Sequence, residues 1–244
     1  MHTIVLSSQK GGPGKTTLSW NIASAAVADG LRVLMVDLDR QQTLRTWWES
    51  RDADYPQMLA EDPTPEDLPA IIAAAAAQFD LLVVDTPGQE AAWIGEVMKL
   101  ADLLIVPVRP SATDVAALGP TLDSVERAGV KMAFVFNQVR QGTKISGKAL
   151  EAVAQHGRVI PVKIIARAVH QDSMGVSALD LKDRQARSEI VELWQWIRED
   201  LDGKARGTRR TGKAAASLDI PVAAGDTRNA SSATPAHRKS KART

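Results

Sequence analysis

The chain has 244 residues, no cysteine and a formal net charge of +1, and it is 44% hydrophobic and 24% charged. This length suits one substantial domain rather than two large ones, and the absence of cysteine excludes a disulfide scaffold and thiolate metal chemistry. No apolar run approaches the roughly 18 to 20 residues that cross a bilayer, so we expect no transmembrane segment. Because no basic leader precedes the first apolar run, we also expect no secretory signal.

Short apolar runs alternate with segments of helical periodicity along residues 1–202. The expected strands are Thr3–Leu6, Val33–Val36, Leu81–Val84, Leu103–Val106 and Ala133–Phe136. The expected helices are Leu18–Ala28, Pro65–Gln78, Ala91–Leu100, Ala112–Ala128, Gly147–Gln155 and Asp183–Leu201. Near-continuous apolar strands that alternate with helices indicate an α/β fold, with one doubly wound, mostly parallel sheet and helices on both faces.

The charge is unevenly distributed between this body and residues 203–244. The last segment contains ten Lys or Arg and two Asp, whereas residues 1–202 contain 20 basic and 27 acidic residues. Its few large apolar residues predict a disordered, basic tail. Such a tail is expected to bind phosphate-rich partners through counterion release, although the same composition also suits a terminus that only aids solubility.

Residues 9–17 read Gln-Lys-Gly-Gly-Pro-Gly-Lys-Thr-Thr and join the first expected strand to the first expected helix. The glycines allow backbone N–H groups to close around a phosphate, and the helix N-terminus adds partial positive charge. We expect Lys15 to reach the β- and γ-phosphate oxygens and the Thr16 hydroxyl to ligate Mg²⁺. ATP and Mg²⁺ are therefore the expected cofactors, and the alternative is a plain glycine turn with two incidental lysines.

The spacing departs from G-x-x-x-x-G-K-[ST], because Gln9 stands where the first glycine is usual and a second lysine, Lys10, precedes Gly11. This pattern resembles the deviant Walker motif of the ParA/MinD ATPases, closest to short plasmid-type ParA partition proteins. The resemblance covers about residues 2 to 200. Further matches are Asp37–Thr43 as a first switch, Phe79–Pro87 as a Walker B strand and second switch, Ala101–Ser111, and Asn137. Arg40, Gln42 and Thr43 depart from the family's usual proline, glycine and serine.

Carboxylates at two strand ends are candidates for metal and water chemistry. Asp85 ends an apolar strand beside the loop, where it can hold a water of the Mg²⁺ shell. The resemblance implies that Asp39 positions the attacking water and that Asp37 lies nearer the metal. The alternative is that Asp37 and Asp39 cap a helix that starts near Thr43. The expected metal residues are Thr16, Asp37 and Asp85.

Lys10 is the most diagnostic residue, because one loop lysine suffices to bind the phosphates. The resemblance implies that Lys10 reaches across a dimer interface to the partner's phosphates; otherwise it is an exposed loop lysine. Asn137 ends a strand near the expected base site, and the resemblance implies that it recognises adenine, whereas its alternative is a turn residue. The expected catalytic residues are Lys10, Lys15 and Asp39. The expected nucleotide-binding residues are Lys10, Gly11, Gly12, Pro13, Gly14, Lys15, Thr16, Thr17 and Asn137.

Residues 158–187 hold a modest excess of basic side chains. The resemblance implies that they line a non-specific DNA-binding face, whereas the alternative is a solvated surface with scattered charges. The expected DNA-binding residues are Arg158, Lys163, Arg167, Lys182, Arg184 and Arg187.

The resemblance implies a cytoplasmic, nucleoid-associated ATPase of the DNA-partition type. It would form a homodimer with ATP, bind DNA non-specifically and be stimulated by a centromere-binding, ParB-like adaptor protein. A related ATPase that positions protein cargo, such as chemoreceptor clusters or carboxysomes, is the alternative. A MinD-like regulator at the membrane is less favoured, because residues 203–244 lack an amphipathic face with bulky apolar groups. We therefore expect no membrane partner, and iron–sulfur relatives are excluded by the missing cysteines.

Overall fold

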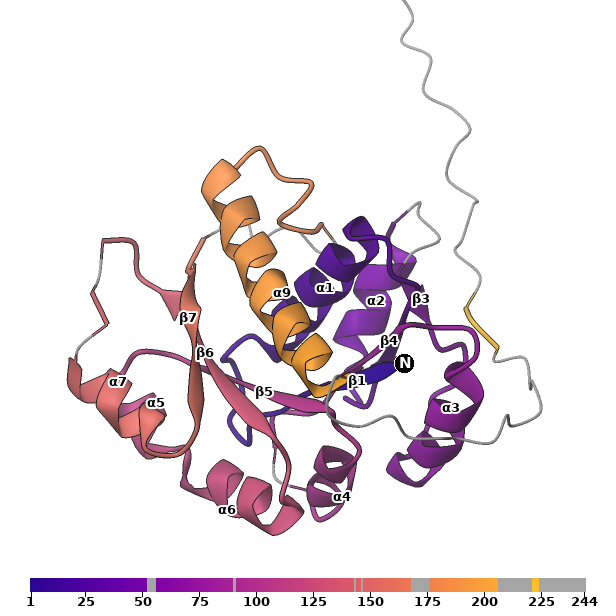
Figure 1. Cartoon of the computed structure of the whole chain (residues 1–244), viewed down its shortest axis with the longest axis horizontal. Coiled ribbons are helices and arrows are strands. Elements are labelled where there is room, and N and C mark those ends of the chain that lie inside the picture. The colour runs from indigo at the N-terminus through magenta and orange to yellow at the C-terminus, as the bar shows by residue number, and fades with distance from the viewer. Residues whose placement is uncertain are drawn as a thin grey trace, which may run out of the picture.

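The chain folds around one seven-stranded sheet with the order β3-β2-β4-β1-β5-β6-β7, in which all neighbouring strands are parallel (Figure 1). The computed structural model describes residues 1–51, 56–89, 91–142, 144–145, 147–167, 176–205 and 221–223. The strands are β1 (His2–Leu6), β2 (Val33–Asp37), β3 (Gln57–Met58), β4 (Leu81–Asp85), β5 (Leu103–Val108), β6 (Met132–Val139) and β7 (Arg158–Ile165). The predicted α/β fold with a parallel sheet is confirmed.

Helices cover both faces of the sheet. They are α1 (Lys15–Ala28), α2 (Thr43–Glu49), the 3₁₀ turn η1 (Pro65–Asp67), α3 (Leu68–Ala75), α4 (Ile94–Lys99), α5 (Ala112–Ala116), α6 (Gly119–Ala128), α7 (Gly147–Ala154) and α9 (Arg184–Ala205). In Figure 1, α1, α2 and α9 lie on one side of the sheet, and α3, α4 and α6 lie on the other.

Each face of the sheet has its own hydrophobic core. Successive side chains of a strand point to opposite faces, so Ile4 and Leu6 of β1 join one core and Val5 joins the other. The first core includes Leu18 of α1 and Leu193 of α9, and the second includes residues of α3, α4, α6 and α7. Burial on both faces explains why the central strands are near-continuous apolar runs.

Strands β3 and β7 were not predicted. Strand β7 contains Arg158, Pro161 and Lys163, which interrupt its apolar run. It lies at one edge of the sheet, where a strand has a single partner and tolerates proline and exposed polar side chains. Strand β3 is the opposite edge and contains only two residues.

The single helix predicted over Ala112–Ala128 is wrong, because the structure has two. Helix α5 ends at Ala116, and α6 begins at Gly119 with Pro120 in its first turn. Proline has no N–H group and restricts the residue before it, so it starts a helix more readily than it continues one.

The end of the chain is described in part. Helix α9 continues to Ala205, three residues beyond the predicted body of residues 1–202. Residues 221–223 are described beside β3, and the rest of the predicted tail lies outside the described residues. Within the described residues, no helix combines the length and the apolar character needed to span a membrane.

Candidate nucleotide site

The polar residues that follow the strands gather at one edge of the sheet, because parallel strands all end there. The loop of residues 7–14 follows β1, and Asp37 and Asp85 are the last residues of β2 and β4. Asp37 and Asp85 are register partners on neighbouring strands, and Leu6 is the partner of Asp85 on its other side. The loop and the two strand-end carboxylates therefore lie side by side.

The path of the loop depends on Gly12 and Gly14. Their φ angles are 90° and 86°, a region in which a side chain is strained. A Cβ atom at Gly14 would lie 2.5 Å from Nδ2 of Asn137, and one at Gly12 would lie 3.0 Å from Nη2 of Arg109. Gly14 is the N-cap of α1, and its carbonyl accepts a hydrogen bond from Leu18. The loop thus turns directly into the amino end of α1.

Lys15 is the first residue of α1, and its side chain is buried. A Cβ atom at Gly88 would lie 3.3 Å from Lys15 Nζ and 2.9 Å from the Cα atom of Gly11, so the segment after β4 packs on both. Burial lowers the pKa of Lys15, and the carboxylates of Asp85 and Asp39 oppose this shift. A buried ammonium group near two carboxylates is suited to an incoming phosphate.

Asp85 is fully buried and accepts two hydroxyl hydrogen bonds. Thr16 Oγ1 donates to Oδ2 at 2.7 Å, and Ser19 Oγ donates to Oδ1 at 3.0 Å. Burial, followed by the negative charge of Asp37, raises the pKa of Asp85 to about 7, while the hydroxyl bonds and Lys15 oppose this rise. The hydroxyl and the carboxylate expected near Mg²⁺ are therefore in direct contact.

Asp37 organises the segment between β2 and α2. Its carboxylate accepts a hydrogen bond from the N–H of Asp39 at 2.9 Å. It also accepts the N–H groups of Leu44 at 3.0 Å and Arg45 at 3.2 Å, in the first turn of α2. Burial raises the pKa of Asp37, and these N–H groups lower it. Asp37 therefore caps α2, whereas the Asp39 carboxylate accepts the nearby N–H of Gln41 at 3.1 Å.

Lys10 contacts its own chain. Its Nζ atom lies 2.6 Å from Oδ1 of Asp114 on α5, and its side chain is 42% exposed. Burial raises the pKa of Asp114, but hydrogen bonds from Lys10 and Ser111 hold it below its usual value. A reach of Lys10 toward a second protomer requires this ion pair to open.

Side chains from the ends of β5 and β6 hold the carbonyl groups of the loop. Nδ2 of Asn137 donates to the Pro13 carbonyl at 2.7 Å. Nε2 of Gln138 donates to the Gly12 carbonyl at 2.9 Å, and Arg109 donates to the same oxygen. Asn137 thus supports the loop, and its contact with adenine stays a prediction.

Gln9, Arg109 and Gln138 were not predicted as site residues. Arg109 directly follows β5, so its strand-end position could have indicated it. Gln9 joins the loop to α6, because its N–H donates to Thr121 Oγ1 at 3.1 Å and its Nε2 donates to Ser124 Oγ at 2.8 Å. Those partners lie more than a hundred residues further along the chain, so no local pattern reveals them.

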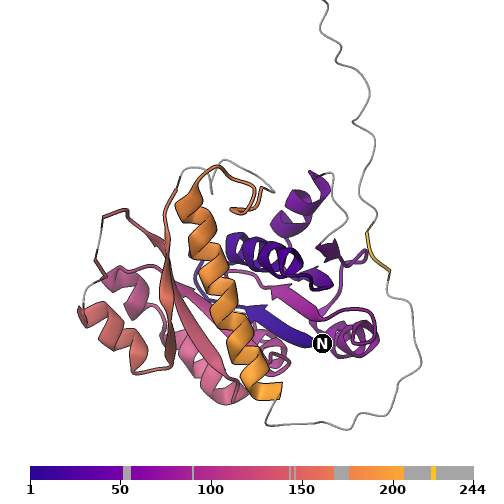
Figure 2. The same cartoon turned by 45° about the horizontal axis from the view of Figure 1, so that its top comes forward.

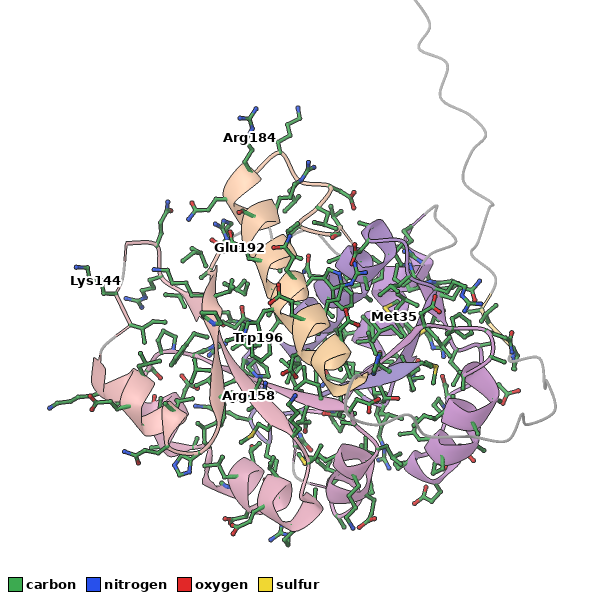
Figure 3. The ribbon with its side chains drawn as sticks, in the orientation of Figure 1. Met35, Lys144, Arg158, Arg184, Glu192 and Trp196 are labelled. Atoms are coloured by element: carbon green, nitrogen blue, oxygen red, sulfur yellow. The ribbon has the colours of Figure 1, made fainter. Side chains whose placement is uncertain are left out.

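The six predicted DNA-binding residues are spread along β7, α9 and the segment between them, of which residues 168–175 lie outside the described residues. Figure 3 shows Arg184 at the amino end of α9 and Arg158 near its other half, beside Trp196. Arg158 is paired with Asp200, and its guanidinium group lies 5.1 Å from the centre of a Trp196 ring. Arg158 is therefore partly neutralised and packed.

Arg167 is also engaged. Its Nη1 and Nη2 atoms lie 2.6 and 2.8 Å from the two carboxylate oxygens of Glu189, and its Nε lies 2.8 Å from Asp183. Its side chain is only 11% exposed. The other four predicted residues are exposed, namely Lys163, Lys182, Arg184 and Arg187.

A glycine loop between a central strand and a helix, with Lys15 and Thr16 at the helix start and Asp85 on the neighbouring strand, defines a P-loop nucleotide-binding protein. The family described as the CobQ/CobB/MinD/ParA nucleotide binding domain matches residues 4–186, and the chain belongs to this family.

Three relatives illustrate the likeness. The chain is 30% identical to the Maintenance of carboxysome distribution protein A of Halothiobacillus neapolitanus, over 78% of this chain and 94% of that protein. It is 26% identical to Protein ParA of Rhizobium radiobacter, over 47% of this chain and 51% of that protein. The structure of the septum site-determining protein MinD of Pyrococcus horikoshii, complexed with Mg-ADP, superposes with a TM-score of 0.64 and 18% identity, over 80% of this chain and 95% of that chain.

Proposed function

We propose that this protein hydrolyses ATP with Mg²⁺ and uses the cycle to position a large protein cargo on the nucleoid. The supporting observation is the match along 94% of a relative that is named for carboxysome distribution. Protein ParA matches over only 51% of its length and at lower identity. The sequence alone favoured DNA partition, and the relatives favour the alternative of protein cargo.

The residues around the loop fit a nucleoside triphosphate. The path through Gly12 and Gly14 leaves no room for side chains, and Lys15 supplies a buried positive charge at the helix start. Mg²⁺, when bound, supplies charge neutralisation at the β- and γ-phosphate oxygens. Thr16 and Asp85 would hold it together with those phosphates. Among the described residues, no group of three or more His, Cys, Asp or Glu side chains could hold a metal ion without the nucleotide.

Asp39 is our candidate for orienting the attacking water. The bond from its N–H to Asp37 fixes its backbone near Lys15, while its carboxylate stays at the surface of the site. Lys15 neutralises charge on the transferring group, and positioning together with charge stabilisation supplies most of the catalysis in such reactions. In an ATP-bound homodimer, Lys10 would leave Asp114 and contact the phosphates of the second protomer.

DNA partition is the second candidate, supported by the likeness to Protein ParA. Both functions would use non-specific DNA as a track, through exposed residues such as Lys182 and Arg184. They differ in the adaptor, which would recognise a centromere-like DNA site in partition and a protein assembly in the favoured function.

Deletion of the gene in its host separates the two functions. We expect mispositioned protein assemblies, seen by fluorescence microscopy, with plasmid and chromosome inheritance unchanged. Complementation with the wild-type gene should restore the spacing, and complementation with Asp39→Ala should not. Loss of plasmids with normal assemblies would favour partition. Normal behaviour of both would contradict the proposal.

A further inference from the structure

A short segment from the end of the chain lies beside edge strand β3, on the side away from β2 (Figure 2). The N–H of Ala60 donates to the Pro221 carbonyl at 3.1 Å, and the N–H of Ala223 donates to the Met58 carbonyl at 2.9 Å. These two bonds flank an antiparallel bridge, so residues 221–223 extend the parallel sheet by one short antiparallel strand.

The side chains of this segment join both cores. Val222 is the bridge partner of Leu59 and packs against the core that contains α3 and α4. Ala223 packs against the core on the other face, which contains α1 and α2. The alternation is that of a strand, since neighbouring side chains point to opposite faces.

An edge strand exposes unpaired N–H and C=O groups, and an added extended segment is a common way to satisfy them. The chain itself supplies the occupant, because only residues 206–220 separate α9 from Pro221. Fifteen residues can span at most about 50 Å, so this connection holds the segment near the edge at high effective concentration. Two hydrogen bonds and two small side chains can then suffice for docking.

Arg45 connects the same edge to the nucleotide site. Its Nη2 donates to the Leu59 carbonyl at 2.8 Å and its Nη1 donates to the Ala60 carbonyl at 3.4 Å. Its Nε donates to Oε1 of Gln42 at 2.6 Å, and its N–H donates to Asp37. The guanidinium group thus ties the residues that receive the terminal segment to Gln42, in the segment that follows Asp37.

We propose that the β3 edge is a docking site for residues 221–223 of the same chain, coupled through Arg45 to the segment from Asp37 to Gln42. Docking orders the carbonyl groups of Leu59 and Ala60, which accept hydrogen bonds from Arg45. Release of the segment therefore loosens the first turn of α2.

Amide hydrogen exchange of the full-length chain tests the docking. Ala223→Pro removes one of the two bonding N–H groups, and we expect the Ala60 amide to exchange at least about tenfold faster. Ala223→Ser keeps that N–H group, so its Ala60 amide should exchange at the wild-type rate. The Leu59 amide is an internal reference, because it donates to Met35 of β2 and should stay protected.

A second variant, Val222→Asp, keeps every N–H but places a carboxylate against the apolar core, and it should also accelerate Ala60 exchange. Unchanged Ala60 exchange in both variants would overturn the docking. Protection that grows over an about hundredfold range of protein concentration would also overturn it, in favour of a second copy as the occupant, because association between copies is concentration dependent.

Exchange of a different amide tests the coupling between the β3 edge and the segment from Asp37 to Gln42. The Leu44 amide precedes Arg45 in the first turn of α2 and donates to Asp37. We expect its exchange to accelerate at least about twofold in Ala223→Pro and not in Ala223→Ser. Faster exchange at Ala60 with an unchanged Leu44 amide would overturn the coupling.

Discussion

The phosphate loop and the basic residues of β7 and α9 both present positive charge, but their surroundings differ. Lys15 is buried near carboxylates, beside a loop whose path requires glycine at positions 12 and 14. Along β7 and α9, Arg158 and Arg167 already have carboxylate partners, whereas Lys182 and Arg184 are exposed. The comparison teaches that the role of a cation follows from its partners in the fold rather than from the number of cations in a segment.

Among the cations compared, we expect substitution of the buried Lys15 to have the largest effect. Lys15→Ala should weaken ATP binding by about a hundredfold or more, because the loss of a desolvated charge partner costs several kcal/mol. Titration calorimetry with a non-hydrolysable ATP analogue and Mg²⁺ measures the affinity. Lys148→Ala, which changes an exposed lysine of α7, is the matched control and should bind like the wild type. Equal affinities of the two variants would contradict the assignment of Lys15.

Asp39→Ala should slow hydrolysis by about a hundredfold while nucleotide affinity changes little, because positioned acid–base groups contribute factors of this size. Phosphate release under single-turnover conditions gives the rate. Gln41→Ala serves as the control, because it keeps the N–H that Asp39 accepts. A normal rate in Asp39→Ala would move the water-orienting role to the segment after β4.

Asp85 should impose a pH dependence on stability. Its pKa is about 7 in the fold and ordinarily 3.8, so between these values the folded state binds more protons than the unfolded state. The unfolding free energy should therefore fall as pH rises through this window, by up to about 4 kcal/mol, and then level off above pH 7.

The measurement is the difference in unfolding free energy between wild type and Asp85→Asn, from urea titrations without Mg²⁺ between pH 4 and pH 8. The difference removes the part of the Asp37 titration that is independent of Asp85 and keeps the electrostatic coupling between the two carboxylates. Parallel curves for the two proteins would show that Asp85 titrates normally.

Arg167→Ala should destabilise the fold by about 3 kcal/mol, because it leaves the largely buried Glu189 without its partner. Arg184→Ala, at an exposed position, should change stability by no more than about 0.5 kcal/mol. Urea titrations of the two variants give the comparison directly. Equal destabilisation would mean that the Arg167 pair contributes no more than a surface charge.

For DNA binding, we expect the exposed basic residues to matter more than the residues that have carboxylate partners. The double variant Lys182→Ala, Arg184→Ala should reduce the slope of log K against log salt by about 2, because each phosphate contact contributes about 0.9. Arg158→Ala should change the slope by less than about 1, since Asp200 already pairs with Arg158 and partly neutralises it. Binding isotherms at several salt concentrations provide the slopes. A larger effect of Arg158→Ala would place the DNA face at that end of the sheet.

Much of the fold could be predicted from the sequence, because central strands of a parallel sheet are buried on both faces. Residues such as Val33–Asp37 and Leu81–Asp85 are buried throughout, so their apolar runs are unambiguous. Edge strand β7 alternates exposed and buried residues around Pro161, and β3 has only two residues, so neither leaves a clear local pattern.

In the site, too, residues placed by a local sequence pattern could be predicted, and residues placed by tertiary packing could not. Lys15, Thr16 and Asp85 were predictable because a contiguous motif and one strand end place them. The pairing of Lys10 with Asp114 and the bonds of Gln9 to α6 depend on tertiary packing. Gln42 was noted as a departure from a usual glycine, and the structure shows why glycine suits this position, because its φ is 53°, in the left-handed region. The cost of that conformation is of the order of 1 kcal/mol.

The strand order also determines how late in synthesis the first strand and the loop after it acquire their partners. Strand β1 is made first, yet its neighbours in the sheet are β4 and β5, and the loop that follows it is held by Asn137 of β6. About 130 residues separate Leu6 from Asn137, which corresponds to roughly 7 to 26 s at ribosomal rates of 5 to 20 residues per second. Ile4, Val5 and Leu6 have no sheet partner until β4 has been made, and β5 completes their pairing later. The phosphate loop therefore gains its supports from β6 only after more than half of the chain has been made.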